Sequence, residues 1–152
     1  MEDCKKLVLY CYERGVWYYA TSGYRSHEEQ QALYNKGRIP ASIAKGEGIV
    51  TNAKPGFSMH NFGLAIDFCK DKDITKHGLQ PDWDTKDYKL LADAAVEMGM
   101  QAGYFFKNIM DAPHIQYKLP SGVNYVTMGE WYKKQKFESV WKELDKRAVV
   151  VS

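Results

Sequence analysis

Residues 58–68 read SMHNFGLAIDF, and this stretch decides the expected fold. Leu64, Ile66 and Phe68 occupy every second position, a period that predicts a β-strand with one face in the core. Asp67 falls on the opposite face, which we expect to line a cleft. The sequence therefore predicts a half-buried strand that carries a carboxylate between apolar neighbours.

The carboxylate of Asp67 needs a partner, because an isolated buried charge is costly. An arginine side chain or a backbone amide would satisfy it. A metal ion shared with His60 is the alternative, since Gly63 would let the intervening loop fold back until both side chains reach one point. The residues alone leave both alternatives open.

His114 offers a third ligand of a suitable type, and Asp111 precedes it by three residues. Three protein ligands and one position open to water are typical of catalytic zinc sites, whereas structural zinc sites are closed and usually contain cysteine. A carboxylate at position 111 could stand beside such a water as the base that takes its proton. His27 and His77 fit no such pattern, and we expect them to face solvent.

The composition excludes several classes of protein. The chain has 152 residues, of which 45% are apolar and 14% aromatic, too many for an intrinsically disordered protein. A formal net charge of +2 is too small for a dedicated nucleic-acid binder. No apolar run approaches the ~20 residues of a transmembrane helix. Residues 1–4 do not resemble a signal peptide, so we expect a soluble protein that is synthesised in the cytoplasm.

The three cysteines, Cys4, Cys11 and Cys69, form no CxxC pair. Cys4 and Cys11 would lie about two turns apart on a helix, which is too far for a disulfide. We therefore expect three reduced, mostly buried thiols.

The order of the predicted elements indicates an α+β domain around a small sheet. Ser26 and Glu29 have the spacing of a capping box, and Thr127 and Glu130 repeat it at the start of a helical tail. Asp84 can cap a helix between them. The expected elements are a helix that ends at Gly15, a strand over 16–21, a helix from Ser26 to Gly37, a long loop over 38–57, a strand over 64–68, a helix from Asp84 to Gly99, a strand over 114–117 and a helical tail with Phe137, Trp141, Leu144 and Ala148 on one face.

Three separated segments occur in a recognisable order: 21–26 (TSGYRS) followed by Glu29 and Gln30, 58–67 (SMHNFGLAID) and 111–114 (DAPH). Together they resemble the zinc D-Ala-D-Ala carboxypeptidase superfamily, which includes vancomycin-resistance carboxypeptidases and the L-alanyl-D-glutamate endopeptidases of phage endolysins and bacilli. The resemblance implies an α+β fold like that of hedgehog signalling domains, with a small antiparallel sheet, flanking helices and a helical C-terminal tail. Residues 60–68, with VTNA at 50–53, look most like the endopeptidase branch.

The resemblance implies a role for each matching residue. It places the ligands of one zinc ion per chain at His60, Asp67 and His114. It places the general base at Asp111, and it places at Arg25 the arginine that contacts substrate or stabilises the developing oxyanion.

Other residues are expected to support this site. Ser58 would hydrogen-bond to a ligand or to substrate, and Tyr24 and Gln30 belong to the same matching segments. One segment departs from the family pattern, because many relatives have Trp-Gly-Gly where this chain has residues 101–106 (QAGYFF). We therefore expect a different specificity pocket beside the catalytic acid.

The chain is expected to contain a catalytic domain over 1–118 and a helical extension over 119–152. The extension has an excess of basic residues. These could attract it to an anionic cell envelope. An amphipathic helix packed on the catalytic domain, with a charged outer face, is the favoured alternative.

The expected function is that of a zinc metallopeptidase that cleaves peptidoglycan stem peptides at the L-Ala–D-Glu bond, in cell-wall lysis or remodelling. The alternatives are a D,D-carboxypeptidase or dipeptidase on the same scaffold, or a non-catalytic zinc-binding module. We expect a monomer that acts on the cell wall or periplasmic side, without nucleic acid and without membrane insertion. If the chain is phage-encoded, a holin would release it.

Overall fold

A computed structural model describes residues 2–148 of the chain. The chain forms two compact units, one built from residues 1–23 and 65–118 and the other from residues 24–64 and 119–152. Within residues 2–148, no helix combines the length and the apolar character needed to cross a bilayer.

The first unit contains an antiparallel sheet of five strands. The strand order is β1-β2-β5-β4. The short strand β3 pairs with the end of β2, at Lys70 and Asp71. The central strand β2 is longer than predicted, because Lys70 and Asp71 also pair with neighbouring strands. Asp71 is buried, and its carboxylate accepts backbone hydrogen bonds from Asp73 and Gln80. The strands are β1 (Tyr18–Ser22), β2 (Ala65–Asp71), β3 (Pro81–Asp82), β4 (Gln101–Ala102) and β5 (His114–Gln116).

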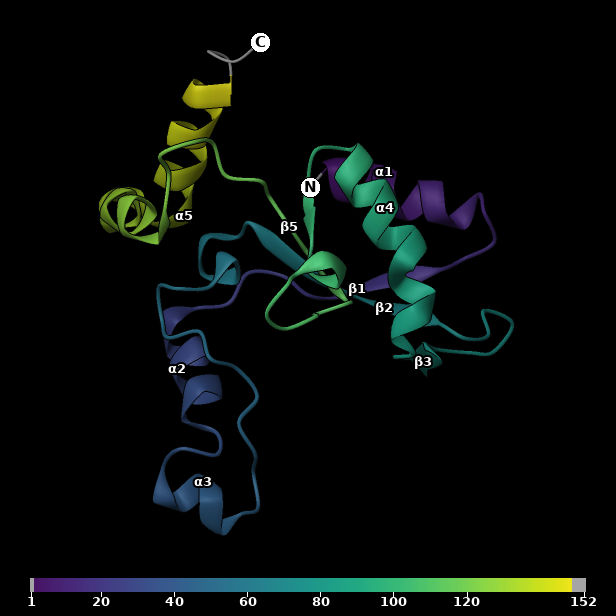
Figure 1. The fold of residues 1–152 in the computed structure, drawn as a ribbon, viewed down its shortest axis with the longest axis horizontal. Coiled ribbons are helices and arrows are strands. Elements are labelled where there is room, and N and C mark those ends of the chain that lie inside the picture. Colours follow the sequence, from purple (N-terminus) through teal and green to yellow (C-terminus); the bar gives the residue numbers. More distant parts are fainter. Residues whose placement is uncertain (1, 149–152) are drawn as a thin grey trace. The chain divides into compact units, whose positions relative to one another are not determined.

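Helices α1 (Glu2–Tyr12) and α4 (Lys89–Glu97) lie side by side and build the core of this unit (Figure 1). Phe68 of β2 is buried in that core together with Leu7 and Leu91, which confirms the predicted core face of the strand. Two short 3₁₀ helices complete the unit, η2 (Thr85–Tyr88) and η3 (Gly103–Phe105). Asp84 caps η2, so α4 begins one turn later than predicted.

The cysteines belong to the first unit. Cys11 and Cys69 are buried and Cys4 is half-buried, and all three are free thiols, as predicted. Burial raises the pKa of the Cys11 thiol to about 11, so this group is inert at neutral pH.

The second unit contains the helices α2 (His27–Asn35), α3 (Pro40–Ala44), η1 (Met59–Phe62) and α5 (Tyr125–Ala148). The capping box of α2 is confirmed: Glu29 donates its backbone N–H to the Ser26 hydroxyl, and the Glu29 carboxylate accepts the Ser26 N–H.

The prediction of a long loop over 38–57 is wrong for Pro40–Ala44, which form α3 with Pro40 in the first turn. Arg38 fastens the rest of the loop. Its guanidinium stacks on Tyr34 and donates hydrogen bonds to the Tyr34 and Thr51 carbonyls and to the Asn52 side chain.

Helix α5 begins earlier than predicted. Asn124 caps it by accepting hydrogen bonds from the backbone and hydroxyl of Thr127, so the expected capping box of Thr127 and Glu130 is wrong. The helix also breaks at residues 135–136, where Lys136 has a φ of 53°. The buried hydroxyl of Ser139 fills this break, since it accepts the Gln135 N–H and donates to the Trp131 carbonyl.

The predicted apolar face of α5 is partly confirmed. Leu144 is buried, whereas Trp141 is 42% exposed and donates its indole N–H to the Phe62 carbonyl of η1 at 2.8 Å.

His27 does not face solvent as predicted, because it is half-buried with its ring centroid 4.9 Å from that of Tyr132. His77 is exposed, as predicted.

Candidate metal centre

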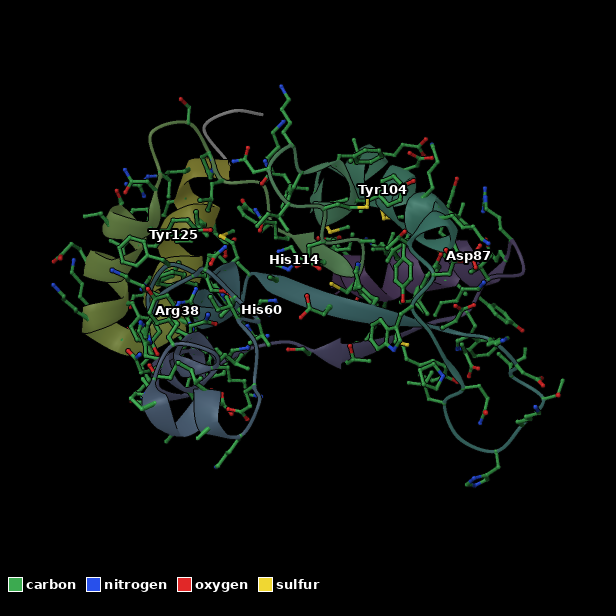
Figure 2. The ribbon with its side chains drawn as sticks, turned by 60° about the horizontal axis from the view of Figure 1, so that its bottom comes forward. Arg38, His60, Asp87, Tyr104, His114 and Tyr125 are labelled. Atoms are coloured by element: carbon green, nitrogen blue, oxygen red, sulfur yellow. The ribbon has the colours of Figure 1, made fainter. Side chains whose placement is uncertain are left out.

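Asp67 and His114 are neighbours on two adjacent strands of the first unit's sheet. They are directly paired residues of the antiparallel strands β2 and β5, so their side chains project from the same face. Nδ1 of His114 lies 3.1 Å from Oδ1 of Asp67. Figure 2 shows His114 beside the long β2 ribbon. The backbone ladder thus fixes an imidazole and a carboxylate side by side.

The second ring nitrogen of His114 is held as well. Nε2 lies 2.9 Å from Oε1 of Gln116, whose amide in turn donates to Gln101. Burial alone would lower the pKa of His114, but the hydrogen bonds to Asp67 and Gln116 and the charge of Asp111 outweigh it, so the pKa is raised. Both ring nitrogens of His114 are therefore within hydrogen-bonding distance of a side-chain oxygen.

The Asp67–His114 pair fits a zinc ion. In a tetrahedral site with bonds of 2.0–2.1 Å, two ligand atoms lie about 3.3 Å apart. The observed 3.1 Å between Nδ1 and Oδ1 is close to that edge. The two side chains are only 10% and 24% exposed, so they are already largely desolvated. Nitrogen and carboxylate donors without cysteine are typical of catalytic zinc sites.

Asp111 lies on the turn that leads into β5. Its carbonyl accepts the His114 N–H, and its own N–H is donated to the Gly103 carbonyl. A Cβ at Gly103 would collide with the Asp111 carbonyl oxygen and would lie 3.0 Å from the Cβ of His114. Only glycine therefore lets η3 pack this closely against the turn that carries Asp111 and His114.

His60 lies in the second unit, on η1, whose four residues are all buried. Gly63 ends this turn in the left-handed conformation with a φ of 66°, where glycine is favoured. The backbone of His60 is fixed because its carbonyl accepts the Arg25 N–H. Asn61 connects η1 to the same segment a second time, since its buried amide donates hydrogen bonds to the carbonyls of Arg25 and Ser26.

Arg25 and Gln30 also meet within the second unit. The guanidinium of Arg25 donates to Oε1 of Gln30 at 3.1 Å, and the Gln30 amide donates to the Ala53 carbonyl at 2.7 Å. Gln30 is fully buried. It therefore orients Arg25 and anchors the end of the 38–57 loop at the same time.

The two other candidate residues lie in the same unit. Tyr24 is 47% exposed, its ring packs on Phe137 and its hydroxyl pairs with that of Tyr132. Ser58 precedes η1 as its N-cap, but its side chain makes no capping hydrogen bond.

Three residues that position this site were not singled out from the sequence. Gln116 has a visible signal, because it alternates with His114 on a short strand and so projects from the same face. Asn61 and Gly103 give no comparable signal. The role of Gly103 depends on the close approach of η3 to the turn that carries Asp111 and His114, which no local pattern shows.

The chain is similar to several known proteins. It is 34% identical over 110 residues to the peptidoglycan L-alanyl-D-glutamate endopeptidase CwlK of Bacillus subtilis, a match that covers 68% of this chain and 62% of that relative. The chain thus spans less than two thirds of the length of this relative.

Solved structures share the fold. The VanY D,D-pentapeptidase of a VanB-type vancomycin-resistance cassette, crystallised with Zn(II), matches with a TM-score of 0.55 and 22% identity, over 92% of this chain and 80% of that one. The LD-carboxypeptidase LdcB matches with a TM-score of 0.53 and 23% identity, over 90% and 70%. The L-Ala D-Glu endopeptidase ChiX of Serratia marcescens matches with a TM-score of 0.50 and 20% identity, over 78% and 80%.

Residues 1–120, most of the chain, match the VanY family of D-alanyl-D-alanine carboxypeptidases. This range contains the three sequence segments described above and the whole of the first unit, residues 1–23 and 65–118. The chain therefore belongs to the VanY D-alanyl-D-alanine carboxypeptidase family.

Proposed function

We propose that this chain is a zinc-dependent hydrolase of peptidoglycan stem peptides and that it cleaves the L-Ala–D-Glu bond. The observation that carries the proposal is the Asp67–His114 pair, which is set at the edge length of a zinc tetrahedron in a member of the VanY family. The Bacillus subtilis relative, named for hydrolysis of this bond, supports the choice of bond.

His60, Asp67 and His114 would hold the zinc ion. Each offers one ligand atom, a ring nitrogen from each histidine and a carboxylate oxygen from the aspartate. His60 and His114 are buried, which suits neutral imidazoles that lose little hydration on binding a metal. When bound, zinc supplies Lewis-acid chemistry and lowers the pKa of a coordinated water toward ~7.

Asp111 would act as the general base. Asp111 is exposed on the turn three residues before His114, and its carboxylate would stand beside the open position without being a ligand. Asp111 would take a proton from the attacking water and return it to the nitrogen of the leaving amine.

Arg25 would stabilise the negative charge that develops on the carbonyl oxygen of the substrate. Its guanidinium is held by the buried Gln30, so little reorganisation is needed during the reaction. Tyr24 and Ser58 would contact the peptide, Tyr24 through its exposed ring and Ser58 through its hydroxyl.

We infer that residues 1–118 are the catalytic domain and that 119–152 are an extension packed on it. The family match over 1–120 supports the boundary. The packing is supported by α5, which contacts η1, and by the hydrogen bond from Trp141 to Phe62, two residues after His60.

Digestion of purified peptidoglycan tests the function. The products of the zinc-loaded protein are separated and identified by mass spectrometry, and the Asp111→Asn variant serves as the control for contaminating enzymes. New amino-terminal D-Glu supports the proposed activity. If D-Ala is released instead, the chain is a D,D-carboxypeptidase, the second candidate, which the description of its family favours.

A third outcome would replace both peptidase functions. If the protein binds zinc stoichiometrically and leaves every bond of the stem peptide intact, it is a zinc-binding module. The retention of Arg25 and Asp111 beside the three candidate ligands argues against that outcome, because a binding module needs the metal but not the base.

A further inference from the structure

Three aromatic rings form a surface cluster in the first unit that the proposed chemistry does not use. The rings of Trp17 and Tyr19 are stacked, with centroids 6.2 Å apart and an interplanar angle of 20°. Tyr12, at the end of α1, meets Trp17 edge-on with centroids 4.4 Å apart. We call these three residues the aromatic platform.

The aromatic platform is not part of the core. Tyr12 is 48% exposed and Tyr19 is 41% exposed, while Trp17 is half-buried between them. The Trp17 carbonyl accepts the Asp71 N–H at 2.8 Å, so the backbone under the platform is anchored to β2. The backbone at Trp17 is thus anchored, and Tyr12 and Tyr19 are the exposed residues of the platform.

Tyr19 of the platform projects from the same face of the sheet as the Asp67–His114 pair. Tyr19 is directly paired with Cys69, and Cys69 is two residues from Asp67 along β2, so all three project from one face. Phe68, between them, points to the opposite face and into the helical core. From strand dimensions, Tyr19 lies about 7 Å along and about 4.8 Å across the sheet from Asp67.

We propose that the aromatic platform binds a sugar ring of the glycan strand to which the stem peptide is attached. A pyranose ring presents a face of C–H groups that packs on an aromatic ring, and its hydroxyls can pair with the phenol groups of Tyr12 and Tyr19. This proposal rests on the proposed function and extends it from the peptide to the sugar.

The position of the scissile bond favours this occupant. In peptidoglycan the L-Ala of the stem is joined to the sugar ring through the lactyl group of muramic acid, so the L-Ala–D-Glu bond lies one residue and one lactyl group from that ring. One extended residue spans about 3.5 Å, and a sugar so close to the metal falls within reach of Tyr19. A bond at the far end of the stem would place the sugar several residues away.

A comparison of two substrates tests the proposal. The first is a free stem peptide that begins with L-Ala-D-Glu, and the second is the same peptide attached to its disaccharide. For Trp17→Ala and Tyr19→Ala we expect KM for the sugar-linked peptide to rise about tenfold, from the loss of about 1.4 kcal/mol of ring contact. We expect kcat, and both constants for the free peptide, to stay at the wild-type values.

Two further variants are matched controls. Tyr19→Phe keeps the ring and should retain most of the affinity for the sugar-linked peptide. Leu9→Ala removes an apolar side chain that is 54% exposed on α1, and it should change neither substrate. An equal loss on both substrates, or no loss on either, would overturn the proposal.

A binding measurement separates this proposal from the proposed function. Glycan strands stripped of peptide by an amidase are mixed with the wild type and with the double variant Trp17→Ala/Tyr19→Ala, and sedimentation gives the bound fraction. Weaker binding by the double variant supports the platform even if the wild type cleaves no peptide. Equal binding by both proteins would sink the sugar assignment, whatever the catalytic result.

Discussion

The guanidinium of Arg25 donates a hydrogen bond to the side-chain oxygen of Gln30, a residue with no exposed surface. A buried amide that also binds the Ala53 carbonyl cannot rotate without losing a second hydrogen bond. The direction of the arginine is therefore fixed by the interior of the second unit.

This relationship predicts that Gln30 acts on catalysis through Arg25. Gln30→Leu should lower kcat by about tenfold to a hundredfold, the worth of one hydrogen bond to a charged group, while the zinc content stays unchanged. Gln30→Glu keeps an acceptor for Arg25 but loses the donor to the Ala53 carbonyl, so kcat should recover in part. Gln31→Leu, on the exposed neighbouring residue, is the control. Steady-state kinetics with metal analysis would contradict the assignment if Gln30→Glu were as slow as Gln30→Leu.

Metal binding and proton transfer should separate in two variants. His114→Ala removes a proposed ligand, so both the zinc content and the zinc-dependent rise in Tm should be lost. Asp111→Asn removes only the proposed base, so zinc should remain while turnover falls by roughly 10²–10⁴-fold. Metal content and turnover are measured side by side for each variant. Loss of zinc from Asp111→Asn would show that Asp111 is a ligand.

Gly103 should tolerate no side chain. A Cβ there would strike the Asp111 carbonyl and press on His114, so Gly103→Ala should lower the free energy of unfolding by about 1–3 kcal/mol and reduce activity. Gly129→Ala is the matched control, because it lies in α5 with nothing within 4 Å of the added Cβ. That change should be neutral or stabilising by up to about 1 kcal/mol. Urea unfolding of both variants gives the comparison.

The break in α5 should depend on one hydroxyl. Ser139→Ala leaves the Gln135 N–H and the Trp131 carbonyl without their bridge, and we expect a loss of about 1–3 kcal/mol of stability. Ser121→Ala, at an exposed serine, should change stability by less than about 0.5 kcal/mol. Similar thermal midpoints for the two variants would show that water replaces the hydroxyl without cost.

The loop over 38–57 should open when its tether is removed. Arg38→Ala deletes three hydrogen bonds and the stack on Tyr34, so limited proteolysis should cut within the loop at least fivefold faster, equivalent to about 1 kcal/mol. Arg14→Ala is a close control, because Arg14 also stacks on a tyrosine but lies outside the loop. If the two variants are cut at equal rates, Arg38 does not restrain the loop.

Local signals predicted much of the fold. The capping box of Ser26 and Glu29 was readable because both partners lie within one turn, and the alternation around Asp67 identified β2 because a strand shows its two faces in the sequence. The start of α5 was misplaced because Asn124 takes the role expected of Thr127. Helix α3 was missed because five residues are too few to show a helical period.

The candidate site was predictable only in part, for a physical reason. Ligand-type residues can be recognised from their chemistry, and a resemblance can assign their roles. The contacts of Asn61 with Arg25 and of Gly103 with Asp111 exist only once the chain has folded back on itself. Residue roles, the monomeric state and release through a holin stay predictions.

The pairing of Asp67 with His114 has a consequence for the recognition of distant relatives. The two residues are 47 positions apart, yet the register of β2 with β5 alone sets their separation. Insertions or deletions in the exposed turn over 74–79 would lengthen or shorten that interval without changing the pairing of the two strands. Searches for remote members of this family should therefore leave that interval free and require the strand register instead, since the register sets the distance between the two side chains.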